Sequence, residues 1–199
     1  MINNSMIQSG DFAIVDSNKT APRIIKYLMR SETLWQDLYR MVTKTLEVPL
    51  YYHALLFLNK DEIIEQQGEV QIKSSEKILN TGNRLFIFRK RNLGESERQI
   101  LIAISKESLG QWYGVMSCIG KTITWLTGIK FFARYIHISK TEICINRVAY
   151  WYKRGIRENF GFKTHTELTT HSLYKYVISH PEKFEIIYEG IPREDNNVN

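Results

Sequence analysis

Residues 51–66 constrain the fold most, because they allow only one simple local structure. Residues 51–58 (YYHALLFL) form an apolar run of strand length, and residues 62–66 (EIIEQ) form a second one. The residues between them, Asn59-Lys60-Asp61, favour a turn. Two apolar runs joined this closely predict a β-hairpin. If the turn is centred on Lys60, Leu55 lies opposite Glu65, and the register of the pair is set.

The rest of the chain alternates between short apolar segments typical of strands and segments whose apolar residues recur at helical spacing. Helix signals include Pro22 as a first-turn residue and Ser31 as an N-cap. The expected strands are 12–15, 51–58, 62–66, a short one through 70–72, 84–88 and 184–188; the expected helices are one from Pro22, one from Ser31 to before Pro49, 96–106, 112–125, one around Cys144 and 173–178. This pattern predicts an α+β fold with one domain over residues 1–190 and a polar tail at 191–199.

Composition limits the possible functions. The chain has 199 residues with 43% hydrophobic residues, enough for a core without disulfides or metals. Its formal net charge of +6 favours anionic partners in general, but no basic cluster predicts a specific nucleic-acid site. We find no apolar stretch long enough to cross a bilayer and no signal peptide at the start, so we expect action in the cytoplasm or delivery by a phage particle.

Three residues form the candidate catalytic set: His53, Glu65 and Cys144. In the predicted hairpin His53 is the diagonal neighbour of Glu65 on the same face, at about 7–8 Å between Cα atoms. A glutamate can span that gap and orient one imidazole nitrogen, which leaves the other nitrogen to face a thiol. A nucleophile, a base and a group that orients the base are the parts of a thiol hydrolase.

Cys144 is the better of the two candidate nucleophiles. Ser139-Lys140-Thr141-Glu142 matches a capping box, which places Cys144 in the first turns of a helix. The positive end of the helix dipole favours a thiolate there. Cys118 lies in an apolar segment and is expected to be a core filler.

Each of these residues also has an ordinary structural interpretation. His53 can be a buried histidine held by backbone groups, Glu65 a solvated hairpin residue and Cys144 an inert core thiol. His137 is a competing base for Cys144. His165, His171 and His180 are expected at the surface. No spacing of His and Cys predicts a metal site, and we expect no cofactor.

In these motifs the sequence resembles the circularly permuted NlpC-type papain-like cysteine hydrolases, which include YiiX-like proteins and relatives of lecithin retinol acyltransferase. The resemblance covers residues 10 to 190. Its elements are the Gly-Asp and strand at 10–15, the histidine strand from His53, the Ile63-Ile64-Glu65 strand, Tyr113-Gly114 before a helix, Cys144-Ile145-Asn146-Arg147-Val148 heading a helix, and a closing helix and strand through Tyr188-Glu189-Gly190. The Ser and Glu that usually follow the nucleophile are Ile145 and Asn146 here, a change expected to alter the rim of the site.

The resemblance implies a papain-like fold, in which the helix that begins with the nucleophile packs on an antiparallel sheet. It implies thiolate attack by Cys144 on an amide or ester carbonyl and an acyl-enzyme intermediate, with His53 and Glu65 completing the site. Backbone N–H groups near Cys144 would hold the oxyanion. Tyr52 and Tyr113 are candidates for substrate binding.

Three functions fit these features. The first is a cysteine amidase or peptidase, with peptidoglycan stem peptides as a candidate substrate. The second is an acyltransferase or lipid esterase of the same fold. The third is a binding or structural module, such as a virion component, that keeps the fold without turnover. The sequence leaves the oligomeric state open.

Overall fold

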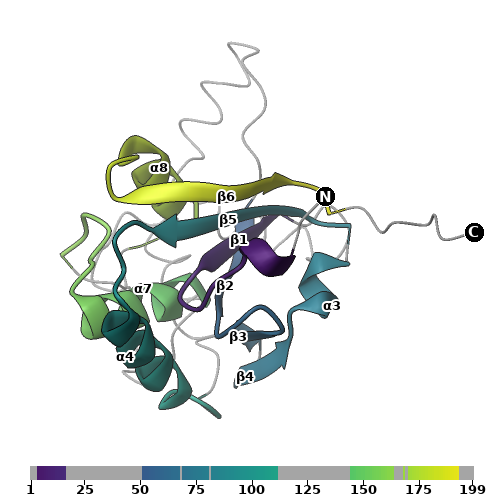
Figure 1. The fold of residues 1–199 in the computed structure, drawn as a ribbon, viewed down its shortest axis with the longest axis horizontal. Helices are drawn as coiled ribbons and strands as arrows, with labels where there is room; N and C mark the ends of the chain where they lie inside the picture. Colours follow the sequence, from purple (N-terminus) through teal and green to yellow (C-terminus); the bar gives the residue numbers. More distant parts are fainter. Residues whose placement is uncertain are drawn as a thin grey trace, which may run out of the picture.

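The computed structural model describes residues 4–16, 51–67, 69–80, 82–111, 144–163, 168 and 170–192. Its centre is a six-stranded antiparallel sheet in the order β4-β3-β2-β1-β5-β6 (Figure 1). The strands are β1 (Phe12–Asp16), β2 (Tyr51–Phe57), β3 (Glu62–Gln67), β4 (Glu69–Ser74), β5 (Arg84–Lys90) and β6 (Phe184–Gly190). The helices are the 3-10 turn η1 (Asn4–Met6), α3 (Glu76–Leu79), α4 (Glu95–Lys106), α7 (Cys144–Ile156) and α8 (Thr170–Ser179). The predicted α+β class is confirmed.

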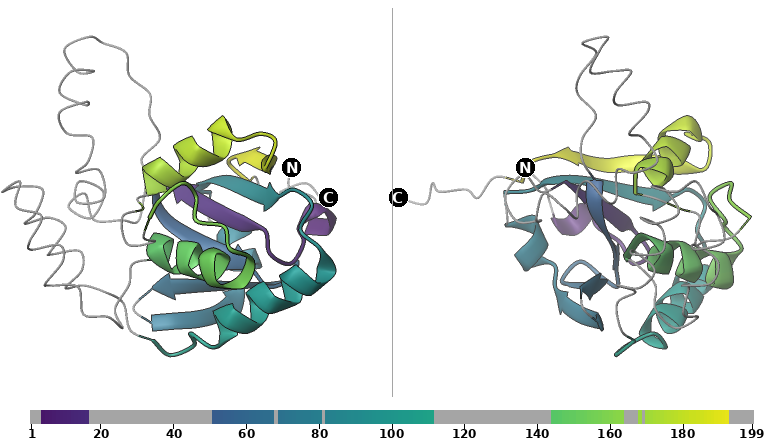
Figure 2. Two further views of the ribbon diagram at one scale, coloured as in Figure 1. Left: turned by 90° about the vertical axis from the view of Figure 1, so that its left-hand side faces the viewer. Right: turned by 180° about the vertical axis from the view of Figure 1, so that it is seen from behind.

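The sheet is buried on both faces, because successive strand residues point to opposite sides. The larger core cluster joins alternate sheet residues to α4, α7 and α8. These three helices lie on the same side of the sheet (Figure 2, left). The smaller cluster, on the other face, joins the remaining sheet residues to α3 and to Ile7. A sheet covered on both faces explains why residues 12–15 of β1 and 85–88 of β5 are continuous apolar runs rather than alternating ones.

The predicted hairpin forms with the predicted register. Leu55 pairs with Glu65 and Phe57 with Ile63. The Asn59 side chain holds the turn by accepting hydrogen bonds from the backbone N–H groups of Asp61 and Glu62, at 2.8 and 2.9 Å. With Leu56 opposite Ile64, the β2–β3 ladder has three pairs and reaches no further along β2 than Leu55. The β3–β4 ladder runs the full length of β3.

Helix α7 fixes the position of Cys144 relative to the sheet. It packs against α4 and against both β2 and β3. Two fully buried side chains on α7 anchor it: the Trp151 indole donates to Ser108 Oγ at 3.0 Å, and the Tyr152 hydroxyl donates to the Gly10 carbonyl at 2.5 Å. Gly155 allows α7 to approach α4 closely, because a Cβ at this position would lie 3.3 Å from the Leu101 Cα.

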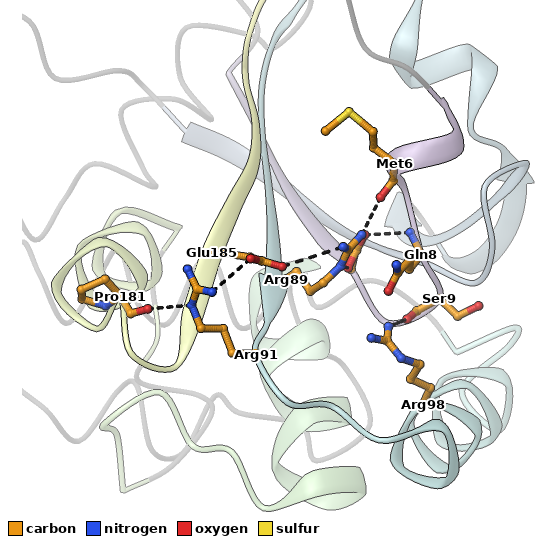
Figure 3. A network of polar contacts seen from close by, with 9 residues as sticks. Met6, Gln8, Ser9, Arg89, Arg91, Arg98, Pro181 and Glu185 are labelled. Carbon is orange, nitrogen blue, oxygen red and sulfur yellow. Dashed lines mark hydrogen bonds and ion pairs between the residues drawn. The ribbon is translucent and has the colours of Figure 1, made fainter.

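The Gly10-Asp11 pair ahead of β1 forms a buried polar junction. The Asp11 carboxylate is fully buried and accepts from the Gln8 N–H and from Arg89 Nε and Nη2, each at 2.8 Å. Arg89 also donates to the Met6 carbonyl and lies 3.8 Å from Glu185 (Figure 3). This network ties the N-terminal segment to β5 and β6.

Several sequence expectations lie outside the described residues. These are the helices expected from Pro22 and Ser31, the helical segment 112–125 and the capping box at residues 139–142. The strands at 12–15, 51–58, 62–66, 70–72, 84–88 and 184–188 and the helices at 96–106 and 173–178 are confirmed, with boundaries that differ by a few residues. Helix α3 was not predicted.

Candidate active site

His53 and Glu65 lie side by side, as the register predicted. The His53 Nε2 is 2.5 Å from Glu65 Oε2. Both residues are buried, with 8% and 3% of their surfaces exposed. They lie where the β2–β3 ladder ends, so their side chains join the two strands just beyond the last backbone pair. The contact through Nε2 leaves Nδ1 as the ring nitrogen available to a thiol.

Lys73 is a third member of this cluster, and the sequence analysis missed it. Its Nζ donates to Glu65 Oε1 at 2.5 Å and to Gln67 Oε1 at 2.8 Å. Glu65 therefore has one oxygen on His53 and the other on Lys73. The rule that related His53 to Glu65 also applies to the next hairpin: because Glu65 pairs with Gln71, Lys73 is a diagonal neighbour of Glu65 on the same face.

Cys144 is the fourth member of the cluster and interacts with His53. It is the first described residue of α7 and is buried, with 2% of its surface exposed. A side-chain hydrogen bond joins it to His53. A strand-borne histidine and a helix-borne cysteine, about ninety positions apart in sequence, thus meet in one place.

The electrostatics of the cluster favour a charged imidazole. Burial opposes the positive charge on His53, but the Cys144 sulfur and the Glu65 carboxylate outweigh it and raise the pKa of His53 from 6.5 to about 10. Burial likewise opposes the charge on Glu65, yet His53 and Lys73 lower the pKa of Glu65 from 4.5 to about 2. At neutral pH the cluster therefore holds an imidazolium beside a carboxylate.

This arrangement can support nucleophilic chemistry at sulfur. An imidazolium hydrogen-bonded to a cysteine stabilises the thiolate, which is the reactive form of the thiol. A carboxylate on the far ring nitrogen fixes the orientation and the tautomer of the ring. Lys73 in turn fixes the carboxylate. Counted with a thiolate on Cys144, the four side chains carry two positive and two negative charges, so the buried cluster is neutral.

The structure describes only part of the remaining predicted site residues. Tyr52 lies in β2, where only its backbone is described, and Tyr113, Cys118 and His137 are outside the described residues. Ile145 and Asn146 are fully buried, with Ile145 in the larger core cluster. Both residues are therefore part of the buried side of α7, and their effect on the rim of the site stays a prediction.

Within the part of the chain that is described, no group of three or more His, Cys, Asp or Glu side chains is arranged to hold a metal ion. No helix in that part combines the length and apolar character needed to cross a membrane. A scan against models of protein families found no match, and a search of curated proteins found none either.

Proposed function

We propose that the chain is a thiol-dependent hydrolase that attacks an amide or ester carbonyl, of the papain-like type that its motifs resemble. The observation that carries this proposal is the position of His53, which lies between Glu65 and Cys144 and contacts both. His53 thus contacts both a cysteine and a buried, ionised glutamate, the two partners that a histidine activating a thiol requires. A carboxylate, a histidine and a cysteine in contact in this order form the arrangement that activates a thiol nucleophile.

The proposed reaction has two halves. The Cys144 thiolate attacks the carbonyl carbon and forms a C–S bond, while the oxygen takes the negative charge. Backbone N–H groups at the start of α7 would stabilise this oxyanion. As the C–N or C–O bond breaks, the His53 imidazolium gives its proton to the leaving amine or alcohol. Water then attacks the thioester and loses a proton to His53, and the acid product leaves with the thiolate restored.

The first test is to map thiol reactivity. The protein is treated with iodoacetamide at neutral pH, and the labelled cysteine is identified by peptide mapping over time. Because a thiolate reacts and a thiol does not, Cys144 should be labelled at least ~10-fold faster than Cys118. Preferential labelling of Cys118 would remove the proposed mechanism.

The same design extends to turnover. A panel of fluorogenic peptide amides, peptidoglycan stem peptides and acyl esters is screened with wild type and with matched variants. We expect Cys144→Ala to abolish turnover while the protein stays folded, and His53→Ala to lower it by about 10²–10⁴-fold through loss of the base. Glu65→Gln should be milder, since an amide oxygen can still accept from the ring. Full turnover by Cys144→Ala would contradict the proposal.

A further inference from the structure

Glu65 is held from two sides, and only one side belongs to the proposed catalytic set. Its Oε2 faces His53 and its Oε1 faces Lys73, both at 2.5 Å. Glu65 is buried, whereas the Lys73 side chain is 23% exposed. A buried carboxylate with a cation on each oxygen cannot rotate without losing a charge-assisted hydrogen bond, which is a strong contact.

The position of Lys73 is itself fixed. Its ammonium also donates to Gln67 Oε1 at 2.8 Å, and Gln67 lies on the same strand as Glu65. The backbone of β4 holds Lys73 opposite Ile63 in a ladder that runs along the whole of β3. The cation therefore stays over the Glu65 oxygen that His53 does not use.

We propose that Lys73 is a positioning residue of the Cys144–His53–Glu65 site. It holds Glu65 charged and aimed at His53, and through His53 it maintains the thiolate on Cys144. Lys73 touches neither the substrate nor the reacting atoms. This inference rests on the proposed thiol chemistry and adds a fourth residue to it.

The charged groups around Glu65 and His53 indicate which property of the site would change if Lys73 were removed. In the described part of the chain, the groups acting on Glu65 are His53 on β2 and Lys73 on β4, and those acting on His53 are Cys144 on α7 and Glu65 on β3. Because Lys73 contributes to the low pKa of Glu65, its removal raises that pKa. Removal also leaves Glu65 Oε1 without its fixed partner, so the carboxylate no longer holds the His53 ring in one orientation, and Cys144 should be alkylated more slowly.

The test measures the rate of Cys144 alkylation by iodoacetamide between pH 4 and pH 10 in the full chain. For Lys73→Met we expect Cys144 to be alkylated about tenfold more slowly than in wild type around neutral pH, because a less well oriented His53 supports the thiolate less. The rates should converge at alkaline pH. Lys73→Arg should restore the rate because it returns a cation to Glu65.

The matched control is Lys77→Met, which removes the same charge from an exposed position on α3. A Lys73→Met profile that coincides with the control would overturn the proposal, as would equal losses for methionine and arginine at every pH. Lys73→Gln serves the same comparison if Lys73→Met does not fold. If wild-type Cys144 reacts no faster than Cys118, the proposed function fails; if it reacts fast and Lys73→Met changes nothing, only the role of Lys73 fails.

Discussion

A single ring, the imidazole of His53, carries one of the two positive charges of the cluster at neutral pH. Its pKa of about 10 lies above the ordinary 6.5, so the native state binds this proton more tightly than the unfolded chain does. The resulting contribution to stability is complete below pH 6.5 and is lost as the pH rises through about 10. For Glu65 the sign is opposite: its contribution is complete above pH 4.5 and is lost as the pH falls towards about 2.

Because Cys144 contributes to the raised pKa of His53, a variant at Cys144 should change the titration of His53. In Cys144→Ala the sulfur no longer supports the imidazolium, so the pKa of His53 should fall below its wild-type value. The shift is measured from the imidazole resonances in a heteronuclear NMR titration. Cys118→Ala is the control and should leave the titration unchanged. A wild-type His53 that titrates near pH 6.5, or one that Cys144→Ala does not affect, would contradict the coupling between the two residues.

At the scale of elements, the β2–β3 hairpin was the most predictable part of the molecule. Apolar residues on both strands and a short turn predict the hairpin, and a turn centred on Lys60 predicts the register; a slip of one residue would turn Glu65 to the other face, away from His53. The contact between His53 and Glu65 followed from that register. Their approach to Cys144 did not, because no periodicity in the sequence says where α7 docks on the sheet.

Two other features were missed for reasons that can be stated. Lys73 follows the exposed Ile72 on the edge strand β4. The pattern of apolar and polar residues in β4 therefore did not indicate that the Lys73 side chain contacts a buried group. Its place beside Glu65 comes from the β3–β4 register, in which Ile63 pairs with Lys73 and Glu65 with Gln71. Helix α3 has only four residues, too few for a helical period to be visible.

The docking of α7 leads to a prediction for this helix. Tyr152 is fully buried, and burial raises its pKa well above the usual value, so its hydroxyl remains a donor to the Gly10 carbonyl. Tyr152→Phe leaves that carbonyl without this donor and should lower the free energy of unfolding by about 1–3 kcal/mol. Tyr150→Phe, on the same helix, removes an exposed hydrogen bond from Arg154 and should change the free energy of unfolding by about 0.5 kcal/mol or less.

Urea denaturation followed by circular dichroism measures both variants. Cys144 lies about two turns from Tyr152, so its alkylation rate should stay within about threefold of wild type in folded Tyr152→Phe. Equal losses of stability in the two variants would show that the Gly10 contact does not hold α7 to the start of β1.

At the scale of the whole molecule, Arg89 on β5 connects the N-terminal segment, through Met6 and Asp11, to Glu185 on β6 (Figure 3). Burial raises the pKa of Asp11 although Arg89 acts to lower it, so the charged carboxylate is maintained at some cost. Arg89 itself has a raised pKa, chiefly through its hydrogen bond to Asp11. The cluster around Glu65 differs in that two cations outweigh burial there.

Removal of Arg89 should therefore destabilise the fold strongly and in a pH-dependent way. Arg89→Met leaves a buried carboxylate without its cation, which should lower the free energy of unfolding by about 3–5 kcal/mol at neutral pH. Without Arg89 the pKa of Asp11 rises further, so the native state gains a proton as the pH falls and the deficit should shrink towards acid pH. The control, Arg84→Met, breaks an ion pair with Glu189 whose side chains are 43% and 42% exposed, and should cost below about 1 kcal/mol. Chemical denaturation at several pH values measures both variants; equal costs, or an Arg89→Met deficit that grows towards acid pH, would mean that Asp11 does not carry a buried charge.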